Sequence, residues 1–260
     1  MGRILASEFI TDKEKLAKYT QSVGSTCPIC DRADKFMVKN QYKKAIGEYL
    51  SSLMQKQNNT RALKGVAKAY KKLKLYDYAI KHLKSALNIT SFDSEIYYEL
   101  GINYLLNAEP EGAIKEFRKS IRLDKKNVNA QIQLAIAHEL SGEEEMALSI
   151  YNKILEENPK STTVYNHLAG LDMEKGDFAS AKNVFIQILK ISPNYHRGFL
   201  GLGICLDRLN EPISAVRYYK KYIAQKPKSK TSYALVNRIC EIYSSKTKNS
   251  NNNGLKVLSF

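Results

Sequence analysis

The residues with the clearest capacity for chemistry are two cysteines separated by two residues, Cys27 and Cys30. Pro28 suits the first turn of a helix, which would place Cys27 close to the N-cap. The helix dipole there lowers the pKa of a thiol and favours redox chemistry. A thioredoxin-type site also needs a strand before the helix, and no such strand is visible.

A tetrahedral zinc site needs four ligands, of which this pair supplies two. Cys205 and Cys240 lie far along the chain, so a complete site would have to be shared by two chains. We therefore expect Cys27 and Cys30 to be inert or only weakly metal-binding, and we expect no cofactor.

The secondary structure around these cysteines can be predicted from a repeat in the sequence. An alanine recurs every 34 residues, at Ala45, Ala79, Ala113, Ala147, Ala181 and Ala215. Twelve residues before each alanine stands a small residue: Ala33, Ala67, Gly101, Ala135, Ala169 and Gly203. Four residues after each stands a large apolar or aromatic one: Tyr49, Leu83, Phe117, Tyr151, Phe185 and Tyr219. Two helices cross closely only where their side chains are small, so these columns indicate stacked helix–turn–helix units.

The columns resemble the tetratricopeptide repeat, and the best single match comprises Tyr97, Leu100, Gly101, Tyr104, Ala113 and Phe117. In the last three units a proline ends the second helix, at Pro159, Pro193 and Pro227. The resemblance implies an all-α, right-handed α-solenoid of six repeats, at 26–59, 60–93, 94–127, 128–161, 162–195 and 196–229. The first repeat departs from the pattern, because Arg32 and Gln57 replace the expected Leu and Pro.

The first and last repeats of a solenoid each have one face without a neighbouring repeat, so capping elements are expected at both ends. Residues 1–25 are expected to form an N-terminal segment, in which the capping-box pattern at residues 11–14 predicts a short capping helix. Residues 230–245 are expected to form the C-terminal cap helix. Its apolar stripe would be Tyr233, Val236, Cys240 and Tyr243. Residues 246–260 are expected to be a disordered tail that ends in an apolar segment.

Composition favours a folded protein, since 43% of the residues are hydrophobic. No apolar run reaches membrane-spanning length and no secretory signal is apparent, so we expect a cytoplasmic protein without a membrane span. The net charge of +15 is uneven, with basic ends flanking an acidic middle at 94–195. Such asymmetry fits nucleic acid or an acidic partner, and it equally fits lysine-rich solvated helix faces.

The resemblance also implies a binding surface, because the first helix of each repeat lines the inside of a curved groove. In the second repeat the groove-facing places hold Arg61, Lys64, Lys68, Lys71 and Lys72. In later repeats they hold Tyr98, Ile102, Leu105, Ile132, Ile136, Asn166, Leu200 and Ile204. The core columns are already filled by other residues, so an exposed apolar strip is expected, as at a binding site. The alternative is that the strip closes on neighbouring helices and the lysines are merely solvated.

The expected function is a non-catalytic adaptor, scaffold or assembly chaperone that holds a peptide or helix of a partner protein. That partner would offer acidic groups to the lysines and apolar groups to the strip. No catalytic residues are expected: nucleophile–base pairs and phosphate-binding loops are missing, and His138 occupies a core place. The alternative is a nucleic-acid-binding or regulatory solenoid that uses the basic ends. The lack of recurring polar pairs and the acidic middle argue against that alternative.

Overall fold

The computed structural model describes the backbone of residues 27–255 and the side chains of residues 27–245. This part of the chain is all helical, with thirteen helices and no strand, which confirms the predicted fold class. The capping helix expected within residues 1–25 and the apolar end of the tail at 256–260 lie outside the described residues.

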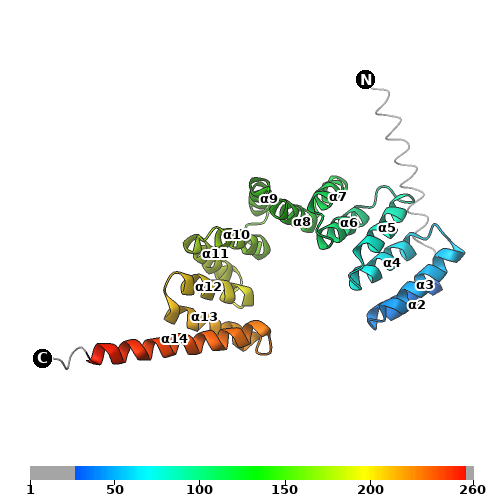
Figure 1. Ribbon diagram of the computed structural model, residues 1–260. Coiled ribbons are helices and arrows are strands. Elements are labelled where there is room, and N and C mark those ends of the chain that lie inside the picture. Colours follow the sequence, from blue (N-terminus) through cyan, green and yellow to red (C-terminus); the bar gives the residue numbers. More distant parts are fainter. Residues whose placement is uncertain (1–26, 256–260) are drawn as a thin grey trace, which may run out of the picture. The chain divides into compact units, whose positions relative to one another are not determined.

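The helices follow one another closely along the chain (Figure 1). In order they are α2 Pro28–Val38, α3 Tyr42–Gln55, α4 Thr60–Lys72, α5 Tyr76–Leu87, α6 Ser94–Leu106, α7 Pro110–Leu123, α8 Val128–Leu140, α9 Glu144–Glu157, α10 Thr162–Glu174, α11 Phe178–Ile191, α12 His196–Arg208, α13 Pro212–Gln225 and α14 Lys230–Leu255. Each range predicted as a repeat therefore contains two helices joined by a short turn.

The turn inside each helix pair uses one residue in the left-handed backbone region, and that residue recurs every 34 positions. The six residues are Asn40, Lys74, Ala108, Gly142, Gly176 and Asn210, with φ between 56° and 79°. Only glycine adopts this region without a steric cost from Cβ. Lys74 and Ala108 show that the geometry is imposed by the flanking helices and not by the local residue.

Helices α4, α6 and α8 each begin with a side-chain N-cap, at equivalent positions of successive repeats. The side-chain oxygens of Asn59, Asp93 and Asn127 accept hydrogen bonds from backbone N–H groups of the following first turn. Such caps stabilise a helix start by about 1 kcal/mol. They fix where each of these helices begins and hence which residues share a face.

The small-residue columns mark the close helix crossings, as predicted. All six periodic alanines are fully buried. A Cβ on Gly101 would lie 2.5 Å from the Phe117 ring, and one on Gly203 would lie 2.6 Å from the Tyr219 ring. Glycine is therefore required at these two places because an aromatic ring of the same helix pair lies directly against the backbone.

The chain divides into two compact units, Met1–Ile150 and Tyr151–Phe260, and the division falls within α9. The first unit has core clusters centred on Tyr49, Leu83 and Phe117. The second has a core around Phe185 and Tyr219.

The C-terminal helix α14 differs from its prediction in two respects. It continues to Leu255, through residues 246–255 that were expected to be disordered. Its packed face is also shifted by one residue, because Ser232, Leu235 and Ile242 are buried and Ile239 packs on the core of the second unit. Members of the predicted stripe are instead exposed: Tyr233 by 63% and Val236 and Tyr243 by 45% each, with Cys240 also exposed.

The physical reason for this shift is that both stripes have the same helical spacing, so periodicity alone cannot choose between them. The small Ser232 lets α14 approach the preceding turn, and its hydroxyl donates to the Lys226 carbonyl at 2.6 Å. A bulky aromatic at the same place would hold the helix away.

Candidate functional site

The five predicted groove cations lie on α4, and three of them form ion pairs with carboxylates from the neighbouring segments. Arg61 forms ion pairs of 2.6 Å with both Asp31 and Asp34 of α2. Lys64 pairs with Asp93, at 3.4 Å, and with Glu95. Lys71 pairs with Glu99 of α6.

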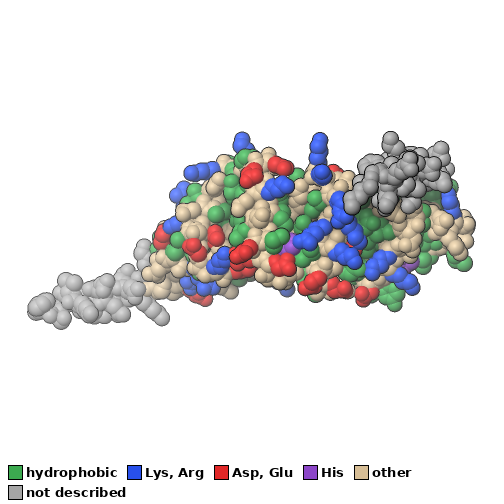
Figure 2. All heavy atoms as spheres, turned by 90° about the horizontal axis from the view of Figure 1, so that it is seen from above, with side chains coloured by type: hydrophobic (Ala, Val, Ile, Leu, Met, Phe, Trp, Pro, Cys, Tyr) green, Lys and Arg blue, Asp and Glu red, His purple; other side chains and the backbone are tan. Residues whose placement is uncertain are grey.

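Arg61, Lys68 and Lys72 are all exposed. Of these three cations, Arg61 is held in the ion pairs with Asp31 and Asp34. On the face drawn in Figure 2, Lys and Arg side chains lie next to Asp and Glu side chains. The exposed face of α4 and its neighbours therefore carries mixed charge, in place of the uniformly basic strip predicted from the sequence.

The acidic partners of α4 were missed by sequence reasoning, although the sequence carried a usable signal. The paired residues are separated by 27 to 31 positions. The separation is shorter than the 34-residue repeat by about one to two helical turns. Such a spacing is expected for residues on the first helices of neighbouring repeats when those helices lie side by side. A search for opposite charges at this spacing would have found them.

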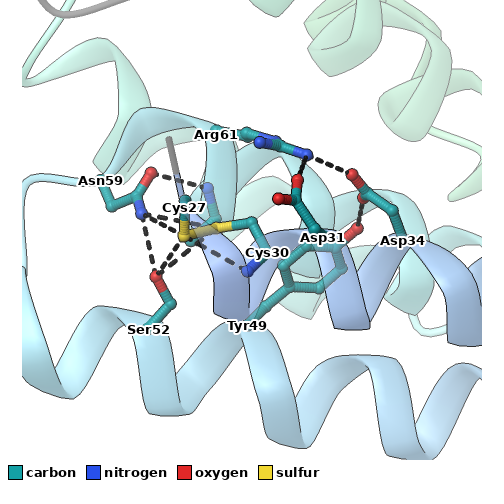
Figure 3. Close-up of polar contacts among 9 residues, drawn as sticks. Cys27, Cys30, Asp31, Asp34, Tyr49, Ser52, Asn59 and Arg61 are labelled. Atoms are coloured by element: carbon teal, nitrogen blue, oxygen red, sulfur yellow. Dashed lines mark hydrogen bonds and ion pairs between the residues drawn. A yellow bond between two sulfur atoms is a disulfide. The ribbon is translucent and has the colours of Figure 1, made fainter. Parts of the chain in front are cut away.

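A polar network holds Arg61 on the exposed face of α4 (Figure 3). The Tyr49 hydroxyl donates to Asp34, whose other oxygen accepts from Arg61. Burial acts to raise the pKa of Asp34, but the hydrogen bonds from Tyr49 and Arg61 outweigh it and lower that pKa. Burial and the neighbouring Asp34 carboxylate raise the pKa of Tyr49. The Arg61 guanidinium is therefore shared between Asp31 and Asp34, which partly offset its charge.

The predicted apolar places in the first unit are more buried than expected. Ile132 is only 7% exposed and belongs to the core. Tyr98, Ile102 and Leu105 are half-buried against the cluster around Phe117. The Tyr98 and Phe117 ring centroids are 5.9 Å apart. The expectation that the core does not need these residues is wrong, because the first helices of successive pairs pack closely enough to use them.

The remaining predicted residues show the same partial burial. Ile136 on α8 and Asn166 on α10 are half-buried. Leu200 and Ile204 on α12 pack against the core of the second unit. Each of these apolar side chains is therefore only partly exposed, and together they do not form a continuous exposed apolar strip.

Comparison with known proteins decides the family. The family model described as the coatomer epsilon subunit matches residues 32–248, most of the chain. The chain belongs to the coatomer epsilon subunit family. Comparison of this epsilon-family chain with curated proteins finds no match.

Solved structures similar to this epsilon-family chain confirm the tetratricopeptide-type fold. PilW, described as a type IV pilus biogenesis factor, is 20% identical, with a TM-score of 0.66 over 80% of this chain and 96% of its own. A tetratricopeptide repeat protein from Parabacteroides merdae is 18% identical, with a TM-score of 0.66 over 88% and 91%. The C-terminal part of a repeat protein from Cytophaga hutchinsonii is 19% identical, with a TM-score of 0.66 over 87% and 90%.

The structure of the epsilon-family chain also bears on four other points of the sequence analysis. His138 is 1% exposed and contacts the Glu143 carboxylate through Nδ1, so it is a core histidine. Cys27 and Cys30 form a disulfide. Within residues 27–245, no cluster of three or more His, Cys, Asp or Glu side chains is arranged to hold a metal. Among the described helices, none has the length and apolar character needed to cross a membrane.

Two hollows in the first unit of the epsilon-family chain lie away from the predicted face. One, of about 630 Å³, opens between α3, α4 and α5 and is floored by Leu53 and Leu63. The other, of about 300 Å³, combines Phe92 and Tyr97 with the cations Lys119 and Arg122. Both are open surface hollows lined by polar and apolar side chains.

Proposed function

We propose that this protein is a non-catalytic protein-binding subunit that holds a segment of a partner protein against the first helices of its repeats. The observation that supports this most strongly is the family match, which covers residues 32–248 and names a subunit of a larger assembly. The helical-repeat fold adds support, because stacked repeats present extended surfaces suited to binding polypeptides.

The contact surface in the first unit would centre on Lys68 and Lys72 of α4. These lysines are exposed, whereas Arg61, Lys64 and Lys71 are already engaged by carboxylates. Acidic groups of the partner would meet the two exposed lysines. Apolar groups would cover the half-buried Tyr98 and Ile102 of α6, where added burial contributes about 25 cal/mol per Å².

A matched pair of charge-reversal variants tests this assignment. Lys68→Glu/Lys72→Glu alters the proposed surface, and Lys81→Glu/Lys115→Glu makes the same change at exposed lysines of α5 and α7. The tagged proteins are used to recover partners from the native cell, and the recovered proteins are quantified by mass spectrometry. Circular dichroism checks that all variants keep their helix content.

The proposal predicts that the first variant recovers the wild-type partner about tenfold less, because two favourable charge contacts become repulsive. The control variant should recover it at the wild-type level. Equal recovery by both variants would contradict the assignment of the surface. Recovery that disappears after nuclease treatment would instead point to nucleic acid as the ligand.

A further inference from the structure

The first turn of α2 carries a disulfide between Cys27 and Cys30 that the proposed protein-binding role does not use. Cys27 is the N-cap residue of α2, and the Cα atoms of the two cysteines are 5.2 Å apart. Cys27 is partly exposed, whereas Cys30 is completely buried. Cys27 is therefore the more accessible residue of the pair, and Cys30 is enclosed by protein.

Hydrogen-bond donors surround both sulfurs. The backbone N–H of Cys30 donates to Cys27 Sγ at 3.2 Å, as in a helix N-cap. The side-chain amide of Asn59 donates to both sulfurs at 3.5 Å. The Ser52 hydroxyl lies 3.3 Å from Cys27 Sγ and 3.5 Å from Cys30 Sγ.

The donors are fixed by the fold, because they come from three different elements (Figure 3). Ser52 is buried in α3, and Asn59 donates to its hydroxyl at 2.9 Å. The other end of the Asn59 amide caps α4 by accepting from the backbone N–H of Ala62. Donors that are held in place in this way stabilise a negatively charged sulfur.

We propose that Cys27 and Cys30 form a thiol–disulfide exchange site that reacts with low-molecular-weight monothiols and their disulfides. A thiolate attacks Cys27 Sγ, a new S–S bond forms there, and the Cys27–Cys30 bond breaks. The electron pair leaves on Cys30 Sγ, where Ser52 and Asn59 donate to it. A second monothiol releases Cys27, so two monothiols are oxidised to one disulfide as the protein gains two electrons and two protons.

The other two cysteines serve as internal references for this chemistry. Cys205 is buried, and burial raises the pKa of its thiol to about 11, which keeps it protonated and inert at neutral pH. Cys240 is exposed on α14 and represents an ordinary accessible thiol.

The test measures reaction of the full chain with oxidised glutathione at pH 6, site by site, by peptide mass spectrometry. In Cys30→Ser, Cys27 is expected to form the mixed disulfide about tenfold faster than Cys240, because its thiolate is favoured at low pH. In Cys27→Ser, the enclosed Cys30 is expected to react more slowly than Cys240. Adding Asn59→Asp to Cys30→Ser retains the cap acceptor for α4 and removes the amide donor, so Cys27 should react more slowly than in Cys30→Ser alone, although the backbone N–H of residue 30 remains.

A redox titration of the wild-type chain with glutathione completes the test. It should show one reversible transition in which two thiols appear together, at Cys27 and Cys30. The proposal is overturned if Cys27 reacts no faster than Cys240, or if Asn59→Asp leaves the rate unchanged. It is also overturned if the reduced protein holds zinc through these cysteines, since that would make the pair a metal site.

Discussion

Replacing Gly142 with alanine should destabilise the first unit, whereas the same replacement at Gly47 should stabilise it. Gly142 occupies the left-handed turn between α8 and α9, with φ of 75°. Gly47 lies inside α3. A Cβ added at either place would meet no atom within 4 Å, so neither substitution changes packing.

The magnitudes follow from the backbone alone. A residue with Cβ costs about 1–2 kcal/mol in the left-handed region. Glycine in turn loses about 0.5–1 kcal/mol more conformational free energy on folding than alanine does. Gly142→Ala should therefore lower the free energy of unfolding by about 0.5–1 kcal/mol, and Gly47→Ala should raise it by about 0.5–1 kcal/mol.

Ala108→Gly provides the reverse experiment at the equivalent turn of the preceding helix pair, where φ is 59°. It should stabilise the protein by about 0.5–1 kcal/mol, since glycine removes the cost that alanine bears there. Urea unfolding followed by circular dichroism measures all three variants, with unchanged m-values showing that the unfolded states are comparable. Changes of the same sign at Gly142 and Gly47 would refute the reasoning.

Three further outcomes are expected. Gly101→Ala should destabilise the first unit by about 1–2 kcal/mol in urea unfolding, because its Cβ would lie 2.5 Å from the Phe117 ring, and a gain in stability would contradict this. Asp207→Asn should lose about 1 kcal/mol near neutral pH, because the hydrogen bond from Arg238 lowers the pKa of Asp207. A carboxyl with a lowered folded pKa stabilises above its unfolded pKa of 3.8, so the difference from wild type should shrink as the pH falls from 5 to 3 in a series of unfolding curves. Lys64→Glu should lower the melting temperature more than Lys68→Glu does, because it places a third carboxylate beside Asp93 and Glu95. Equal melting temperatures would show that these contacts do not matter.

The helical-repeat fold could be predicted from the sequence, because the packing of each helix pair depends on the sizes of a few side chains at fixed positions. Ala113, Gly101 and Phe117 are buried, and residues of similar size stand at the equivalent places of the other repeats, 34 positions apart. Their packing could therefore be predicted from the period alone. The face of α14 could not be predicted in this way, because Ser232 and Tyr233 begin two stripes of equal spacing. Only the approach of the preceding turn decides between them.

The candidate binding surface was predicted only in outline. The cations of α4 were placed on one face, but their carboxylate partners come from α2 and α6, as with Asp31 and Glu99. Reading each helix separately cannot reveal such pairs. The disulfide was likewise not predicted. Its hydrogen-bond donors Ser52 and Asn59 lie 22 to 32 positions further along the chain, so the cysteine spacing alone could not reveal them.

The central claim, that a partner protein binds against the first helices, is tested most directly by site-specific photocrosslinking. p-Benzoylphenylalanine is introduced in place of Lys68, Lys72 or, as the control, Lys115, and the full chain is irradiated in the native cell. The account predicts an adduct with one partner protein from positions 68 and 72 that survives nuclease treatment, and none with that protein from position 115. An adduct from position 115 alone, equal adducts from all three positions, or adducts destroyed by nuclease would contradict it.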